Sequence, residues 1–142
     1  MRTTLAAGAV VLALAGCSTM EHMGTMTPGM RLQLSGINEV PPNNSSGSGT
    51  ATVNVAADCS VTASVSVVGM TATAAHIHTG TTGANGGVAV PFTKTGDNTF
   101  SAPAGAKLNS DQCAAYKRGD TYVNVHSATY PNGELRAQLP GG

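Results

Sequence analysis

The sequence contains no tryptophan, and aromatic residues make up only 4% of its 142 residues. Charged residues are also scarce, at 10%, and acidic and basic residues balance to a formal net charge of zero. Because the chain has no basic excess with which to neutralise phosphates, its composition argues against nucleic acid as a partner. The length predicts one small domain, and low charge combined with many Thr, Ser and Val residues is typical of β-sheet.

An apolar segment near the N-terminus is too short to span a bilayer. It covers residues 5–15, follows a single positive charge at Arg2, and runs into Leu14-Ala15-Gly16-Cys17, as export signals do. The last four residues resemble the lipobox of bacterial lipoproteins. This resemblance implies that residues 1–16 are a signal peptide and that Cys17 is acylated. The alternative is an ordinary secretory signal with a chance cysteine.

An acylated Cys17 makes the lipid bilayer a partner of this protein. Several acyl chains, at about 0.8 kcal/mol per buried methylene, would anchor a small domain firmly. We therefore expect a lipid-anchored protein of the bacterial cell envelope, on the periplasmic face of the outer membrane or on the cell surface.

Residues 17–30 show no strand alternation, so we interpret them as a tether between the lipid and a domain over residues 31–142. The tether holds His22 and four of the six methionines of the chain, Met20, Met23, Met26 and Met30. Thioethers are soft ligands that suit Cu(I). His22, Met20, Met23 and Met26 are therefore candidate accessory metal ligands, and an inert linker of biased composition is the alternative.

Two cysteines remain once Cys17 is assigned to lipid. These are Cys59 and Cys113. An exported protein lies in a compartment that favours oxidation, and an even number of cysteines can pair completely there, so we predict a disulfide between them. Such a bond would help to stabilise a small domain with few aromatic residues. Two buried free thiols are the alternative.

Short runs in which apolar and polar residues alternate predict seven or so strands. The one convincing helix covers residues 109–119, because Asn109 and Gln112 form a capping box and Gly119 suits the C-terminal end. Many short strands with a single helix favour an antiparallel β-sandwich. The predicted strands lie at residues 31–36, 50–56, 61–67, 74–80, 88–92, 99–101, 121–127 and 134–139.

Three of the four histidines lie in predicted strands. His76 and His78 are two residues apart, so they point to the same side of a strand while Ile77 faces the core. The same alternation turns His126 away from the buried Val123 and Val125. If the two strands are neighbours, the three imidazoles could share one metal ion.

Four segments of the chain carry a resemblance to a known family. In this order they resemble the CHRD (chordin-type) domain, over residues 31–139. The resemblance implies an extracytoplasmic, all-β Greek-key sandwich of poorly defined biochemical role. The segments are residues 36–42 (Gly-Ile-Asn-Glu-Val-Pro-Pro), 75–80 (Ala-His-Ile-His-Thr-Gly), 122–126 (Tyr-Val-Asn-Val-His) and 130–136 (Tyr-Pro-Asn-Gly-Glu-Leu-Arg).

The histidine pattern also resembles that of Cu/Zn superoxide dismutases. Those enzymes carry a His-X-His strand and a later Val-His strand that supply copper ligands, and an arginine beside the metal near the C-terminus. The matching residues are His76, His78, His126 and Arg136, which implies a copper site with an anion-attracting Arg136. No residue matches the histidine that bridges copper and zinc or the zinc-binding loop, so copper would have three protein ligands unless His22, a tether methionine or water adds another.

Three functional hypotheses follow. The one that we favour is a copper-binding envelope lipoprotein in which His76, His78 and His126 hold the ion as neutral ligands. The second is a structural or protein-interaction module of the cell envelope with no metal, in which the histidines only form hydrogen bonds. The third is a dismutase-like redox enzyme, which the missing bridging ligand weakens. We therefore expect binding rather than catalysis.

Overall fold

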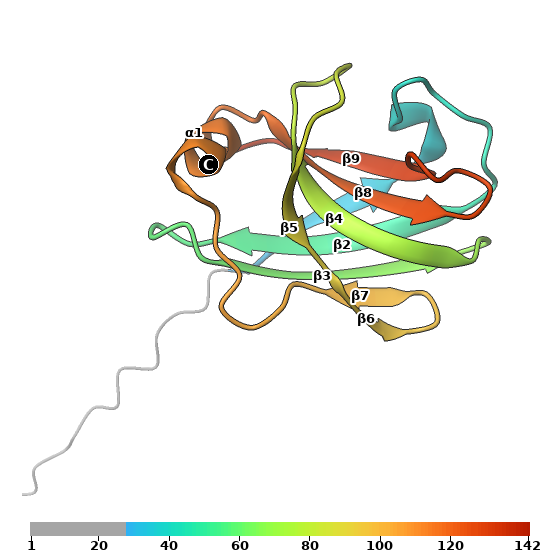
Figure 1. Cartoon of the computed structure of the whole chain (residues 1–142), viewed down its shortest axis with the longest axis horizontal. Coiled ribbons are helices and arrows are strands. Elements are labelled where there is room, and N and C mark those ends of the chain that lie inside the picture. The colour runs from blue at the N-terminus through green and yellow to red at the C-terminus, as the bar shows by residue number, and fades with distance from the viewer. Residues whose placement is uncertain (1–27) are drawn as a thin grey trace, which may run out of the picture.

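The structure is a computed structural model that describes residues 28–142. Two antiparallel sheets pack face to face as a β-sandwich (Figure 1). This architecture confirms the predicted all-β sandwich. The first sheet has the order β1-β2-β3-β7-β6, formed by Met30–Leu34, Ser48–Val55, Val61–Val68, Thr99–Ser101 and Thr93–Gly96. The second has the order β5-β4-β8-β9, formed by Val88–Pro91, Ala72–Thr79, Thr121–Ser127 and Leu135–Leu139.

The core lies between the two sheets and is built from the inward positions of alternating strands. Val53 and Val65 enter it from the first sheet, and Ile77, Val123 and Leu135 enter it from the second. Each is buried almost completely, and burying an aliphatic side chain of this size stabilises a fold by about 1.5–3 kcal/mol. The alternation read from the sequence therefore predicted the inward face correctly.

One strand was missed in the sequence. β6 pairs with β7 at the edge of the first sheet, and all four of its residues are exposed. Without a buried position it has no alternation of apolar and polar residues to reveal it. The prediction also differs from the structure at Met30, which we counted in the tether. Met30 is the first residue of β1 and packs against the core.

The helix α1 covers Ser110–Lys117 and begins as predicted. Asn109 is the N-cap, and its side chain and that of Gln112 form both bonds of the capping box. Gly119 follows the helix with a positive φ of 81°, a conformation that glycine adopts without strain. Among the described residues, no helix has the length and apolar character needed to cross a membrane.

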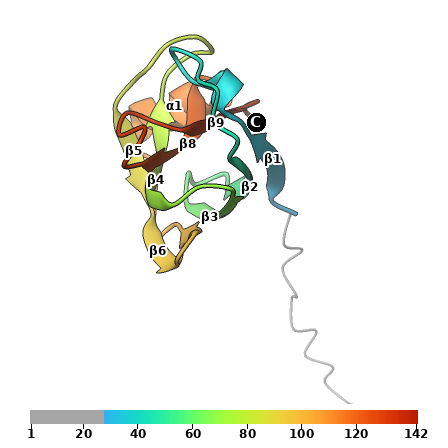
Figure 2. The same ribbon diagram turned by 90° about the vertical axis from the view of Figure 1, so that its right-hand side faces the viewer.

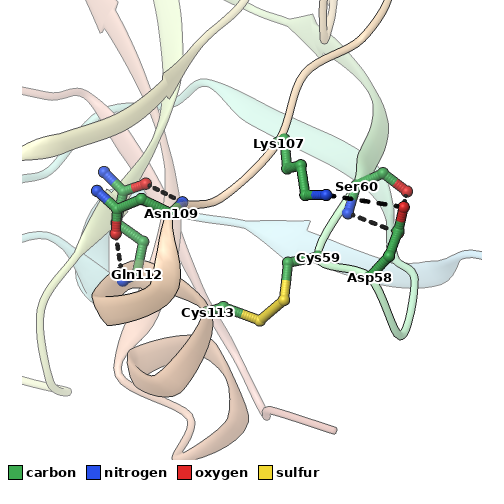
Figure 3. Close-up of a disulfide and its surroundings, with 7 residues drawn as sticks. All are labelled: Asp58, Cys59, Ser60, Lys107, Asn109, Gln112 and Cys113. Carbon is green, nitrogen blue, oxygen red and sulfur yellow. Dashed lines mark hydrogen bonds and ion pairs between the residues drawn. A yellow bond between two sulfur atoms is a disulfide. The ribbon is translucent and has the colours of Figure 1, made fainter.

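The predicted disulfide is present. Cys59, in the turn between β2 and β3, is bonded to Cys113 of α1, and the two Cα atoms are 5.9 Å apart (Figure 3). In the same turn, Asp58 forms an ion pair with Lys107 at 3.9 Å. The disulfide thus ties the helix to the first sheet. The helix itself lies in the connection from β7 of the first sheet to β8 of the second.

The outer face of the second sheet is not open to solvent throughout. Tyr122 and Asn124 of β8 point away from the core, yet they are only 3% and 2% exposed. Three connections cover this face: the 3-10 helix η1 (Gly36–Asn38) with the residues that follow it, the loop 80–87, and the turn 128–134. Figure 2 shows the first two on the side of β8 and β9 that faces away from β2 and β3.

Candidate metal centre

Two neighbouring strands bring the three predicted histidines together. In the register of β4 and β8, Ala74 pairs with His126 and His76 pairs with Asn124, so His76 and His126 are diagonal neighbours on the same face. One nitrogen of each of the three rings, His78 included, lies within 4.8 Å of the others. Such a group of three could hold a metal ion.

Backbone carbonyls orient two of the rings. The Nδ1 of His78 lies 3.0 Å from the Gly86 carbonyl oxygen, and the Nδ1 of His126 lies 2.9 Å from that of Pro131. A carbonyl only accepts hydrogen bonds, so each Nδ1 carries the proton and each neutral ring keeps its Nε2 lone pair. Metal-bound histidines are held by outer partners of this kind.

The other ring nitrogens of the cluster differ in whether they have a hydrogen-bond partner. The Nδ1 of His76 lies 2.9 Å from the Nε2 of His126, so in the neutral pair His76 donates and His126 accepts. The Nε2 of His78 is buried and has no hydrogen-bond partner. A buried, unpaired polar atom is costly, and a metal ion is a partner that would satisfy this lone pair.

Burial lowers the pKa of all three imidazoles. It is the main cause that brings the pKa of His76 to about 4, and the nearby His126 and His78 lower it further. Burial also lowers the pKa of His78 and of His126, against the opposing effect of their bonds to the Gly86 and Pro131 carbonyls. The three rings are therefore neutral at neutral pH, which is the form that binds metal.

Arg136 of β9 lies beside the cluster but faces protein groups. Its guanidinium carbon is 3.5 Å from the centre of the Tyr122 ring, and Tyr122 stacks on His78 with 5.0 Å between ring centres and 4° between planes. The side chain is only 1% exposed, and its Nη atoms donate to acceptors of the loop 80–87 and to Gln138. The anion-attracting role that we expected for Arg136 stays a prediction.

The loop 80–87 depends on Gly86. A Cβ atom at this position would overlap the carbonyl oxygen of Thr79, whereas a Cβ at Gly87 meets nothing within 4 Å. Gly86 also donates its backbone N–H to the Tyr122 hydroxyl at 3.2 Å. The carbonyl that orients His78 therefore belongs to a position that only glycine can occupy.

Gly86→Ala is expected to weaken metal binding, because the loop must shift and the carbonyl of residue 86 then leaves the Nδ1 of His78. Losing an outer partner of a metal ligand lowers metal affinity by about 10–100-fold. Gly87→Ala is the matched control and is expected to bind like the wild type. Competition with a chelator of known copper affinity measures both variants, and equal affinities of the two would contradict this role of Gly86.

Glu39 and Asn124 form a buried polar pair beside the histidines that the sequence did not reveal, and Gly133 packs closely against both. The Asn124 side chain donates to the Glu39 carboxylate, and a Cβ at Gly133 would overlap the Asn124 amide and lie 2.8 Å from both Glu39 oxygens. Glu39 is 5% exposed, and burial raises its pKa from 4.5 to about 7 despite the opposing effects of Arg136 and Asn124. Its place in the first family-like segment was the one available signal.

The raised pKa makes the Glu39 contribution to stability pH-dependent. The folded state holds the Glu39 proton up to about pH 7, whereas the unfolded chain releases it near 4.5. The free energy of unfolding therefore loses this contribution as the pH rises from 4.5 through 7. The pKa values of the three histidines are lowered in the folded state, so these residues make the free energy of unfolding rise with pH. They do so equally in wild type and in Glu39→Gln, and their effect cancels when the two proteins are compared.

Glu39→Gln is accordingly expected to be more stable, relative to the wild type, at about pH 8 than at about pH 5. Urea unfolding of both proteins at the two pH values measures this difference of differences. A gap that does not change with pH would show that Glu39 has an ordinary pKa.

Several predicted residues lie outside the described part of the chain. They are the signal peptide (residues 1–16), Cys17, and the candidate accessory ligands His22, Met20, Met23 and Met26. Their roles stay predictions.

The four family-like segments meet at the outer face of the second sheet. Asn38 of the first segment donates to the Arg136 carbonyl of the last, at 3.2 Å, and Asn124 of the third donates to Glu39 of the first. Arg136 in turn holds the loop that follows the His-X-His segment. Residues up to 98 positions apart in the chain thus build one site.

The fold and the site define a β-sandwich protein with a three-histidine cluster on one outer face. The family model of the CHRD domain matches residues 30–139, so the chain belongs to the CHRD domain family. No curated protein and no solved structure matches the chain significantly. The resemblance of the histidine pattern to Cu/Zn superoxide dismutase is therefore not confirmed.

Proposed function

We propose that this protein is a lipid-anchored protein of the bacterial cell envelope whose CHRD domain binds copper through His76, His78 and His126. The observation that carries the proposal is the buried, unpartnered Nε2 of His78 beside two further imidazoles. The large majority of buried side-chain nitrogens have a hydrogen-bond partner. A metal ion would give the His78 Nε2 atom such a partner.

The chemistry of the three ligands favours copper. Imidazole nitrogen suits copper and zinc, and copper has the highest affinity of the divalent first-row metals for a given site. The site offers three neutral imidazole ligands whose nitrogens lie within 4.8 Å of one another. The methionines at positions 20, 23 and 26 add soft ligands for Cu(I) in the same chain.

Metal analysis of protein purified without a chelating resin tests this proposal. Near-stoichiometric copper, or its uptake on dialysis against Cu(II) in the presence of equal Zn(II), is the expected result. Protein that takes up neither copper nor zinc in this dialysis would refute it. Zinc uptake in place of copper would keep the site but correct the metal.

Lipid anchoring is the second part of the proposal and rests on Cys17. We expect the mature protein to partition into the detergent phase, and Cys17→Ala to move it to the aqueous phase, because this thiol is the acylation point. Phase separation of membranes from expressing cells measures it. Exported wild-type protein that stays in the aqueous phase would contradict the anchor.

A protein-interaction module without metal is the second candidate function. The hydrogen bond between the Nδ1 of His76 and the Nε2 of His126 favours it, because this bond closes part of the cluster without an ion. The copper dialysis distinguishes the two candidates. A dismutase-like activity is not proposed.

A further inference from the structure

We propose that Arg136 is a positioning residue that sets the orientation of His78 for metal binding. This inference rests on the metal site proposed above. Arg136 does not touch His78 itself. It acts by two routes, one through the Tyr122 ring and one through the loop 80–87, and both end on His78.

The first route is a stack of three planar groups on neighbouring strands. Arg136 lies over one face of the Tyr122 ring, with its guanidinium carbon 3.5 Å from the ring centre. Tyr122 is the cross-strand partner of His78 and stacks on it almost in parallel, at 4°. Cation–π attraction holds the tyrosine between the two. The plane of the His78 ring is thereby set by Tyr122, and that of Tyr122 by Arg136.

The second route is the loop that carries the Gly86 carbonyl. The Nη2 of Arg136 donates to the carbonyls of Thr81 and Ala84, each at 3.0 Å, and its Nη1 donates to the Asn85 side chain at 3.3 Å. These bonds hold the loop against the sheet up to the residue before Gly86. The Gly86 carbonyl oxygen then accepts a hydrogen bond from the Nδ1 of His78, with 3.0 Å between the two atoms. The proton stays on Nδ1, and the Nε2 lone pair is left free for the metal.

Only His78 depends on Arg136 in this way. His126 is oriented by the Pro131 carbonyl of a different loop, and His76 bonds to His126. An arginine suits the role because its planar fork stacks on an aromatic ring and serves several acceptors at once. A lysine keeps the charge but provides neither the flat face nor the fork.

The test combines two variants with a matched control. Arg136→Lys removes the fork, and Tyr122→Leu removes the middle of the stack, so either can decide the matter if the other fails to fold. Lys94→Met is the control, because Lys94 also lies over a ring, 5.8 Å from the centre of Phe100, and donates to the Ala72 carbonyl, at the opposite end of β4 from His78.

The first readout needs no metal. Nitrogen-15 spectra of the metal-free protein at neutral pH report which nitrogen of each imidazole carries the proton. Wild type and Lys94→Met should show His78 with its proton on Nδ1, whereas Arg136→Lys and Tyr122→Leu should show a mixture of both forms for His78 and no change for His126. An unchanged His78 in both folded variants would overturn the inference, even if the protein bound no metal.

The second readout is copper affinity in a double-mutant cycle. Arg136→Lys should lower the affinity of the wild type by about 10–100-fold, as expected for an outer partner of a ligand. In a His78→Ala background it should have little further effect, and in a His126→Ala background it should keep its full effect. Equal losses in the two backgrounds would show that Arg136 supports the fold in general. A wild type without copper binding would instead refute the proposed function.

Discussion

Replacing any one of His76, His78 or His126 with alanine is expected to lower copper affinity by at least ~10-fold, because removing a ligand costs no less than removing its outer partner. The three side chains project from β4 and β8, which are paired over most of their length. A rigid backbone holds each ring in place, so no neighbouring side chain can replace a lost imidazole. The protein should remain folded, since all three rings lie outside the apolar core.

Competition with a chelator of known copper affinity measures these losses. His22→Ala is the control within the chain, and it should change affinity much less, because His22 is proposed only as an accessory ligand and the three-histidine site stays intact in this variant. Wild-type affinity in the His76→Ala/His78→Ala double variant would exclude the three-histidine site. Copper, if still bound, would then belong to the methionines of the tether.

Loss of the disulfide is expected to have the largest effect on stability. Cys59 and Cys113 are separated by 54 residues, and closing a loop of this length stabilises a fold by ~4 kcal/mol on the chain-entropy account. For a domain of this size, the Cys59→Ala/Cys113→Ala double variant should unfold at a Tm lower by roughly 10–25 °C. Apart from the main chain, the bond is the one covalent link between α1 and the first sheet in the described residues.

Thermal unfolding with and without reductant provides the measurement and its control. Reductant should lower the Tm of the wild type to about that of the double variant, and it should leave the variant unchanged. A wild type that is insensitive to reductant, with thiols that alkylate in the native state, would show that the two cysteines are not bonded in solution.

The histidine cluster shows which part of a site can be derived from a strand pattern. Side chains two apart on a strand share a face by geometry, so His76 and His78 were certain to point together once Ile77 was assigned to the core. The position of His126 beside them was conditional, because it required β4 and β8 to be neighbours. His126 lies 50 residues from His76, and strand pairing over such a distance is decided by how the whole sandwich packs.

The groups around the cluster could not be derived from that pattern. Alternation assigns Tyr122, Asn124 and Arg136 to the outer face, where polar residues are ordinarily solvated. In the structure they are buried, because three connections fold back over the sheet. Alternation with a period of two shows which face of the sheet a side chain points to. It does not show whether a loop covers that face.

The sequence by itself determined the strands with a buried face, the inward residues, the helix caps and the disulfide partners. Each of these follows from local geometry or from a simple count of cysteines. The tertiary structure alone decided that Arg136 contacts Tyr122, that Gly86 orients His78, and that Glu39 is buried against Asn124. These contacts join residues distant in the chain, and they form only when the loops close on an assembled sheet, since loop conformation depends on what the loop packs against.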